Sequence, residues 1–369
     1  MAWLWGSAGT AIAALSIVTA SAGIFSERRA EIEATIDKGL QHIADLQQDD
    51  GSFPRTYGYY PGVVGMAGMA FLAKGHMPGE GPYGDTLNRC VDYVLSRQSA
   101  SGVFYRQGGR GDMYSHCLST LFLSEVSGCV DAGRQEKIHT AVADGLSIIL
   151  RAQAVRKQAQ HQGGWRYKPN STDSDLSVSG WAIMALRSAR LNGAPVPDAA
   201  IDSAIRYVIS SYNPDEKGFS YIPPARFERS GTSSSMSAVA ILCLELTGKH
   251  GHPIIKPTAE AILDLTETEN HRHKNTAYGN YYIAQAMFQI GGDHWERYAG
   301  WMYPFYIENQ NLEGSWGRDS GAFVFRRNRE VDKSNHGSVY ETSITLLALS
   351  VPFRQLPIYQ RDATLEELD

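Results

Sequence analysis

The strongest polar cluster in the sequence is Asp173-Ser174-Asp175, which stands just before an apolar stretch, Leu176 to Ala189, that we expect to be a helix. An aspartate at this place can accept hydrogen bonds from the free amides of the first turn and meets the positive end of the helix dipole. Neighbouring carboxyl groups also change each other's pKa, as a group that donates a proton requires. A cap explains one of the two aspartates well, and an acid role for the pair stays open.

A second polar cluster, Asp112 to Cys117, opens another expected helix. Asp, His and Cys are zinc ligands, and Asp112 and His116 are four residues apart, so they could share a helix face. Two ligands do not make a metal site. We therefore expect Asp112 to cap the helix and His116 to be hydrogen-bonded inside the fold, with no metal and no cofactor.

The helices that would position these clusters are of two kinds. One kind is amphipathic, as in Ile32, Ile36, Leu40 and Ile43, whose spacings of three and four place them on one face. The other kind is small or apolar nearly all round and must be buried on most sides. It comprises residues 63–72, 114–126, 176–189, 234–246, 276–290 and 339–351.

The two kinds alternate around a repeated signal, a Gln-containing helix end followed by glycine and an aromatic residue. The copies centre on Gly51, Gly102, Gly164, Gly218 and Gly314. Each hairpin can bury its apolar helix only by stacking on its neighbours, as in repeat proteins. The sequence predicts an all-α, single-domain αα toroid of about six helical hairpins over residues 33–361, with a tail at 362–369.

Composition limits the partners and raises a question about location. The 369 residues are 43% hydrophobic and 20% charged, with a net charge of −5 and no basic stripe, so we expect no nucleic-acid partner. Residues 1–26 carry no charged side chain, and the run Ala11 to Val18 is followed by Ala20-Ser21-Ala22, as in a signal peptide. Arg28 and Arg29 just after it favour a retained membrane anchor instead. Both interpretations predict an exported, periplasmic or membrane-associated protein; an ordinary buried or surface-lying helix is the third alternative for this segment.

Several motifs resemble one family. Gly163 to Tyr167, Asp175 to Trp181, Tyr278 to Tyr282 and Leu356 to Arg361 are similar to the bacterial prenyltransferase/squalene oxidase repeat proteins. With the Gln and Gly-x-aromatic repeats, they resemble the αα toroid of squalene-hopene cyclases and protein prenyltransferase β subunits. The resemblance covers roughly residues 33 to 361.

This resemblance implies a reaction for the aspartate cluster. The region resembles the Asp-x-Asp-Asp motif of class II terpene cyclases, in which an aspartate protonates an alkene, and implies Asp175 as proton donor with Asp173 as its hydrogen-bonding partner. The sequence departs from that motif at Leu176, where the family has a polar residue. A prenyltransferase is a weaker alternative, because the Asp-x-Cys zinc pair of that family is missing.

Aromatic residues crowd the same ends of the apolar helices. They pack as core or line a chamber for an isoprenoid chain, in which aromatic faces stabilise carbocations. The second interpretation predicts a squalene/terpene cyclase-like protein acting on a polyprenyl or triterpene; the rival is a non-catalytic module that holds a lipid or protein. The expected substrate-binding residues are Tyr114, His116, Trp181, Tyr278, Tyr281, Tyr340 and Glu341.

Overall fold

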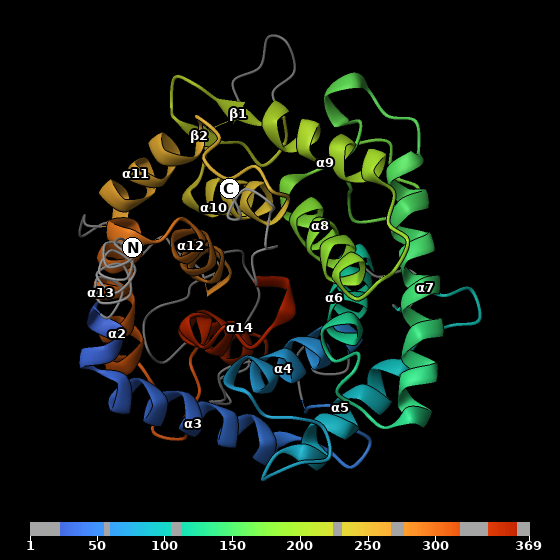
Figure 1. Ribbon diagram of the computed structural model, residues 1–369, viewed down its shortest axis with the longest axis vertical. Helices are drawn as coiled ribbons and strands as arrows, with labels where there is room; N and C mark the ends of the chain where they lie inside the picture. Colours follow the sequence, from blue (N-terminus) through green and yellow to red (C-terminus); the bar gives the residue numbers. More distant parts are fainter. Residues whose placement is uncertain are drawn as a thin grey trace, which may run out of the picture.

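A computed structural model describes residues 23–54, 60–104, 112–223, 231–266, 277–317 and 339–359. Its helices form two concentric rings (Figure 1). The inner ring consists of α4 (Pro61–Lys74), α6 (Asp112–Glu125), α8 (Leu176–Leu191), α10 (Ser234–Leu246), α12 (Ala277–Ile290) and α14 (Val339–Leu349). The outer ring consists of α3 (Arg29–Leu46), α5 (Gly84–Ser96), α7 (Ala132–Ala154), α9 (Asp198–Ser210), α11 (Ile255–Thr266) and α13 (Gly292–Glu308).

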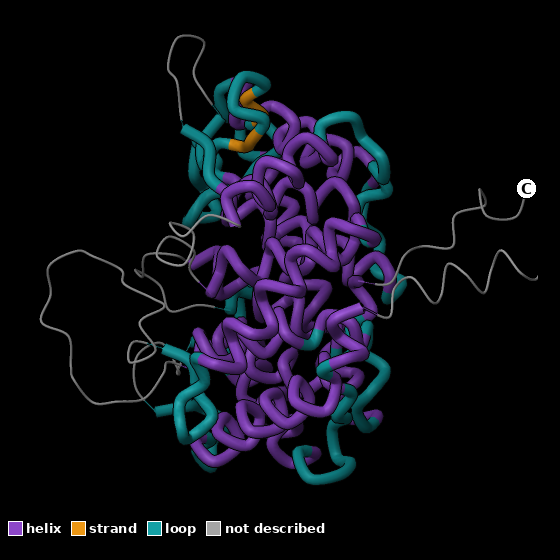
Figure 2. The backbone as a smooth tube through the Cα atoms, turned by 90° about the vertical axis from the view of Figure 1, so that its left-hand side faces the viewer, coloured by secondary structure: helices purple, strands orange, loops and turns teal. Residues whose placement is uncertain are grey.

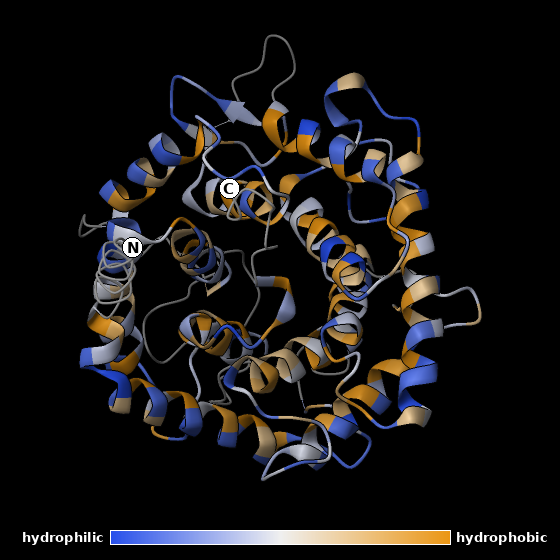
Figure 3. Ribbon diagram, in the orientation of Figure 1, coloured by the Kyte–Doolittle hydropathy of each residue, from blue (hydrophilic) through white to orange (hydrophobic). Residues whose placement is uncertain are grey.

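The inner ring is closed. Each inner helix packs on the next, and α14 packs on α4, although these two are at opposite ends of the sequence. The inner helices are buried almost throughout, whereas the outer helices carry hydrophilic and hydrophobic residues side by side (Figure 3). The predicted all-α toroid is therefore confirmed.

Strand structure within the described ranges is limited to a short antiparallel hairpin, β1 (Tyr212–Asn213) and β2 (Gly218–Phe219), near the top of Figure 2. Short 3₁₀ turns occur at η1 (Ala159–His161), η4 (Val351–Phe353) and η5 (Pro357–Tyr359). The last two follow α14 and pack against the inner ring.

The repeated glutamines join neighbouring outer helices. In each of four copies, the side-chain amide donates one hydrogen bond to the carbonyl of the repeat glycine and another to a carbonyl of the next outer helix in the ring. In the last copy that next helix is α3, since Gln310 donates to the Thr35 carbonyl at 2.9 Å. These glutamines are Gln47, Gln98, Gln153 and Gln310.

The structure corrects two of the expected repeat positions. In the third copy the amide of Gln153 donates to Gly163, not Gly164, and Gly163 has the positive φ of 94°. In the fourth copy the positive φ falls on Lys217 (48°) instead of on Gly218, and the β1–β2 hairpin occupies this region. Two adjacent glycines, and a lysine in a conformation that favours glycine, shifted the apparent register by one residue.

A short helix, α2 (Gly23–Glu27), precedes the predicted toroid and packs on α13. The Phe25 ring lies 6.0 Å from the Tyr303 ring and 5.5 Å from the Phe353 ring. Residues 1–22 and the tail 362–369 lie outside the described residues. Among the helices of the described part of the chain, none has the length and apolar character needed to cross a membrane.

Candidate functional site

Asp175 is the N-cap residue of α8. Its Oδ1 accepts hydrogen bonds from the Val178 backbone N–H at 2.9 Å and from the Ser177 hydroxyl at 2.6 Å. An isolated bridge between Trp165 and Asp175 fixes the backbone at this point, and the Asp175 side chain is 0% exposed. The expected cap is therefore present, and it lies fully inside the molecule.

Arg166 connects the two aspartates of the cluster. Its Nη1 lies 3.0 Å from Oδ2 of Asp175, and its Nε lies 3.3 Å from Oδ2 of Asp173. Asp173 is 48% exposed and makes no hydrogen bond to Asp175, so the direct partnership expected from the sequence is replaced by a bridging guanidinium. A cation between two carboxylates removes the repulsion that direct contact of two anions would cause.

Burial and hydrogen bonding act in opposite directions on the Asp175 carboxyl. Desolvation raises its pKa, while the hydrogen bonds from Ser177 and Val178 and the charge of Arg166 lower it. Burial prevails, so the pKa of Asp175 lies above its usual range. This group combines a raised pKa with three donors that stabilise its anion.

Tyr114 and Tyr278 lie near Asp175 at the N-terminal ends of α6 and α12, and Tyr340 of α14 neighbours Tyr278. The Tyr114 hydroxyl hydrogen-bonds to the Ser177 hydroxyl, which in turn donates to Asp175. The pKa of Tyr278 is raised, first by burial and then by the neighbouring Tyr114, Tyr340 and Asp175. Tyr114, Tyr278 and Tyr340 are partly exposed, and burial raises the pKa of each.

Deeper in the ring, aromatic side chains fill the space. The Trp181 and Tyr281 rings are stacked with centroids 5.7 Å apart, and Tyr282 packs edge-on against both. All three are buried. At this level of the inner ring, the three aromatic side chains are packed against one another.

His116 is placed away from this group. Its Nε2 bonds to the Gly145 carbonyl of α7 at 3.0 Å, and its Nδ1 accepts from the Phe104 backbone N–H at 3.3 Å. Burial lowers its pKa to about 4, so the ring is neutral. It links the inner and outer layers, and we leave it out of the proposed site.

Two further predicted residues add little to the site. Glu341 is half-buried in the first turn of α14. Asp112 begins α6, but its side chain lies outside the described part of the structure. In the described ranges no group of three or more His, Cys, Asp or Glu side chains could hold a metal ion.

Sequence reasoning missed Arg166 and Tyr221 as members of the site. The Arg166 guanidinium lies 4.7 Å from the ring centroid of Tyr167 and 5.6 Å from that of Tyr221. The hydroxyl groups of these two tyrosines are hydrogen-bonded to each other. Arg166 directly follows the Gly-x-Trp signal of the third repeat, which could have marked it. No sequence motif around Tyr221 marks it as a site residue. It is brought to the site by tertiary structure, since the Leu176 backbone N–H donates a hydrogen bond to the Tyr221 carbonyl.

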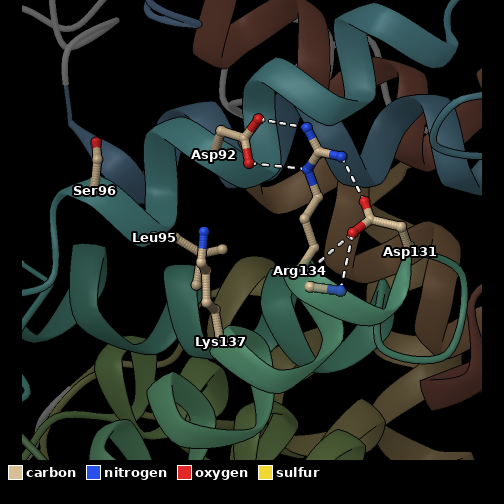
Figure 4. Close-up of a pocket in the computed structure, with 7 residues that line it drawn as sticks. Asp92, Leu95, Ser96, Asp131, Arg134 and Lys137 are labelled. Atoms are coloured by element: carbon tan, nitrogen blue, oxygen red, sulfur yellow. Dashed lines mark hydrogen bonds and ion pairs between the residues drawn. The ribbon is translucent and has the colours of Figure 1, made fainter.

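A separate hollow of about 650 Å³ lies on the outer ring between α5 and α7 (Figure 4). Arg134 pairs there with Asp92 at 2.6 Å and with Asp131 at 2.5 Å. Arg134 and Lys137, which also lines the hollow, together balance the two carboxylates, so the hollow has no net charge from these groups.

Comparison with known proteins places the fold. No protein-family model matches the chain. A drimenyl diphosphate synthase of Streptomyces showdoensis is 26% identical over 217 residues, which are 58% of this chain and 34% of that protein, so the match spans about a third of the relative's length.

Three solved structures cover most of the chain. The type II terpene cyclase MstE from Scytonema (apo) has a TM-score of 0.54 and 12% identity over 88% of this chain and 98% of its own. A protein from Actinoplanes has a TM-score of 0.53 and 15% identity over 87% and 99%. An MstE variant in complex with geranylgeranyl dihydroxybenzoate (substrate) has a TM-score of 0.52 and 12% identity over 89% and 99%. This chain thus has the helical toroid fold of the type II terpene cyclases.

Proposed function

We propose that the protein is a terpene cyclase that protonates and cyclises a polyprenyl or triterpene substrate, with Asp175 as the proton donor. The observation that carries the proposal is the state of Asp175: a fully buried carboxyl whose pKa is raised by burial, with Tyr114 and Tyr278 in its neighbourhood. An acid that protonates an alkene must be protonated before the reaction and must leave a stable anion afterwards. Burial raises the pKa of Asp175 and so favours the protonated acid, whereas the hydrogen bonds from Ser177 and Val178 and the charge of Arg166 stabilise the anion.

The chemistry needs no other reactant. The Asp175 proton adds to one alkene carbon, the alkene electron pair forms the new C–H bond, and the other carbon becomes a carbocation. The next alkene attacks that cation and closes a ring; the last cation loses a proton to water, and Asp175 takes a proton back from water, so that the acid is regenerated. Aromatic faces such as those of Tyr114 and Tyr278 stabilise the cations as they do other cations.

The comparisons support an isoprenoid substrate. The relatives with a named activity are a drimenyl diphosphate synthase and a type II terpene cyclase that binds geranylgeranyl dihydroxybenzoate. The match to MstE spans 98% of its chain, so one toroid of this size is compatible with a cyclase.

A non-catalytic lipid-binding module is the second candidate. Both Asp175 oxygens are occupied by a helix cap and an ion pair, which are structural roles, and Trp181, Tyr281 and Tyr282 fill the ring below the tyrosines. A binding protein would hold a lipid against the same tyrosines without proton transfer.

Product analysis with farnesyl diphosphate, geranylgeranyl diphosphate and squalene tests the two functions. We expect a cyclic product from the wild type and a loss of about a hundredfold or more in Asp175→Asn, because the amide keeps the cap acceptor but has no acidic proton. Asp173→Asn, which alters the exposed partner of the same arginine, is the matched control and should keep most of the activity. Full turnover in Asp175→Asn contradicts the proton-donor role, and lipid bound by the wild type without any product supports the binding module.

A further inference from the structure

A small cavity lies where the inner ring meets the chain that follows α14. It has a volume of about 10 Å³ and is bordered by Ala73 of α4, Gln285 of α12 and Leu347 of α14. Ser350 and side chains of the segment 351–359 complete its wall. The cavity is therefore bounded by three inner helices and by the segment that leaves the last of them.

Two buried side-chain oxygens of this wall have no hydrogen-bond partner. Gln285 and Ser350 are each 2% exposed, and within the described part of the chain no group bonds to Oε1 of Gln285 or to Oγ of Ser350. A buried polar atom without a partner destabilises the folded state, because folding has removed its hydrogen bonds to solvent. Both residues border the same cavity, so a single molecule bound there contacts both of them.

The size and charge of the cavity select its occupant. A volume of about 10 Å³ is the space that one water molecule requires, and a larger ligand does not fit. None of the described residues that border the cavity carries a carboxylate, and Arg354 is among them, so the site disfavours a metal cation. Water is neutral, and it can donate a hydrogen bond to the Gln285 side-chain carbonyl while it donates to or accepts from the Ser350 hydroxyl.

We propose that this cavity is a binding site for one structural water molecule, which bridges Gln285 on α12 to Ser350 at the end of α14. Buried waters of this kind bond to polar groups that have no other partner. The far end of the following segment is already attached to α12, since the Gln289 side-chain amide donates to the Tyr359 carbonyl at 3.0 Å. The water fastens the beginning of the segment to the same helix.

Thermal unfolding of Ser350→Ala and Ser343→Ala tests the site by the sign of the change in Tm. Ser343 is the matched control, because it lies about two turns earlier on α14, is 0% exposed and also has a hydroxyl without a partner, but does not border the cavity. Ser350→Ala removes a partner of the water, so we expect its Tm to fall by about 1–3 °C. Ser343→Ala removes a buried hydroxyl that no water serves, so its Tm should equal or exceed that of the wild type.

Two results of this comparison overturn the proposal. One is a Tm of Ser350→Ala that equals or exceeds that of the wild type, because the hydroxyl then has no partner to lose. The other is an equal fall in both variants, because the loss is then unrelated to the cavity.

A double-mutant cycle with Gln285→Met tests whether both side chains hold the same molecule. Met has a similar length but lacks the strong acceptor oxygen of Gln. Once either side chain is replaced, the water has lost a partner, so the second replacement costs less. We expect the fall in Tm of the double variant to be smaller than the sum of the two single falls, and additive falls contradict a shared water.

A crystal structure of the wild type that resolves ordered water identifies the occupant directly. We expect one water within about 3.2 Å of both Oε1 of Gln285 and Oγ of Ser350. An empty cavity, a direct hydrogen bond between the two side chains, or another part of the chain in the cavity overturns the proposal.

Discussion

Two buried carboxyl groups differ in the charges around them. Asp175 caps the start of α8 and forms a direct ion pair with Arg166, whereas Glu125 at the end of α6 is hydrogen-bonded by neutral donors and feels the charge of Arg187 without forming an ion pair with it. The Ser188 hydroxyl donates to Oε1 of Glu125, and the Ile358 N–H donates to Oε2 at 3.3 Å. Glu125 therefore anchors the segment after α14, while Asp175 lies at the opposite, N-terminal end of an inner helix.

Glu125 gives the protein a pH-dependent stability. Burial raises its pKa from 4.5 to about 7 in the folded state, so between these values the folded protein binds more protons than the unfolded one. The free energy of unfolding must then fall as pH rises through this window, by up to about 3 kcal/mol. Glu125→Gln, which keeps an acceptor oxygen but does not ionise, should lose this contribution.

Denaturant unfolding of the wild type and Glu125→Gln at pH 5 and pH 8 measures the effect. Taking the difference between the two proteins cancels His116, whose lowered pKa has the opposite influence on stability in the acid range. We expect the free energy of unfolding of Glu125→Gln to increase relative to that of the wild type as pH rises from 5 to 8. A difference that is the same at both pH values contradicts the assignment.

Outer helices are held together at the repeat glycines. Gly163 has a φ of 94°, and a Cβ there would lie 2.2 Å from the Ser203 carbonyl oxygen of α9. The glycine therefore permits both the left-handed turn and the close approach of the next outer helix. Without that approach, Gln153 could not reach the Gly163 and Ala200 carbonyls together.

Gly163→Ala and Gly193→Ala separate these two requirements. Gly193 has a similar φ of 85° but nothing within 4 Å of its Cβ position. Gly193→Ala should cost only the left-handed backbone strain, about 1–2 kcal/mol, and Gly163→Ala should cost several kcal/mol more in chemical unfolding. Equal losses would show that the contact with α9 is unimportant.

At the scale of the whole molecule, the ring is closed by the last repeat. Gln310 donates to the Gly314 and Thr35 carbonyls, both at 2.9 Å, and so joins α13 to α3 across almost the entire sequence. Gln98 makes the same two types of bond, to Gly102 and Ala141, between outer helices that are close in sequence. The two glutamines make the same hydrogen bonds and differ mainly in the number of residues between the two outer helices that each one joins.

Hydrogen exchange of Gln310→Ala and Gln98→Ala tests the closure. Each substitution removes two hydrogen bonds and should cost about 1–3 kcal/mol. We expect Gln310→Ala to lose protection first in α3 and α13, where the ring opens, and Gln98→Ala to lose it in α5 and α7. A uniform change over all helices in Gln310→Ala would argue against a seam at this position.

Part of the site could be derived from the sequence, and the reason differs from residue to residue. The Asp175 cap was predictable because capping depends only on the residue type before a helix. The sequence also allowed the prediction that Tyr114 and His116 point to opposite sides of their helix, because side chains two residues apart on a helix are rotated by about 200°. The ion pair of Asp175 with Arg166 was not predictable, because the two residues are nine positions apart in irregular chain.

The sequence by itself determined the alternation of amphipathic and apolar helices, because periodicity and burial are local properties of each segment. It also determined the repeated Gln and glycine signals, apart from the one-residue shifts at Gly163 and Lys217, which the backbone φ angles reveal. The tertiary structure decided that α14 packs on α4, that Arg166 stands between the two aspartates, and that the rings of Trp181, Tyr281 and Tyr282 pack on one another. These arrangements join residues from separate helices, and their geometry exists only once the ring has closed.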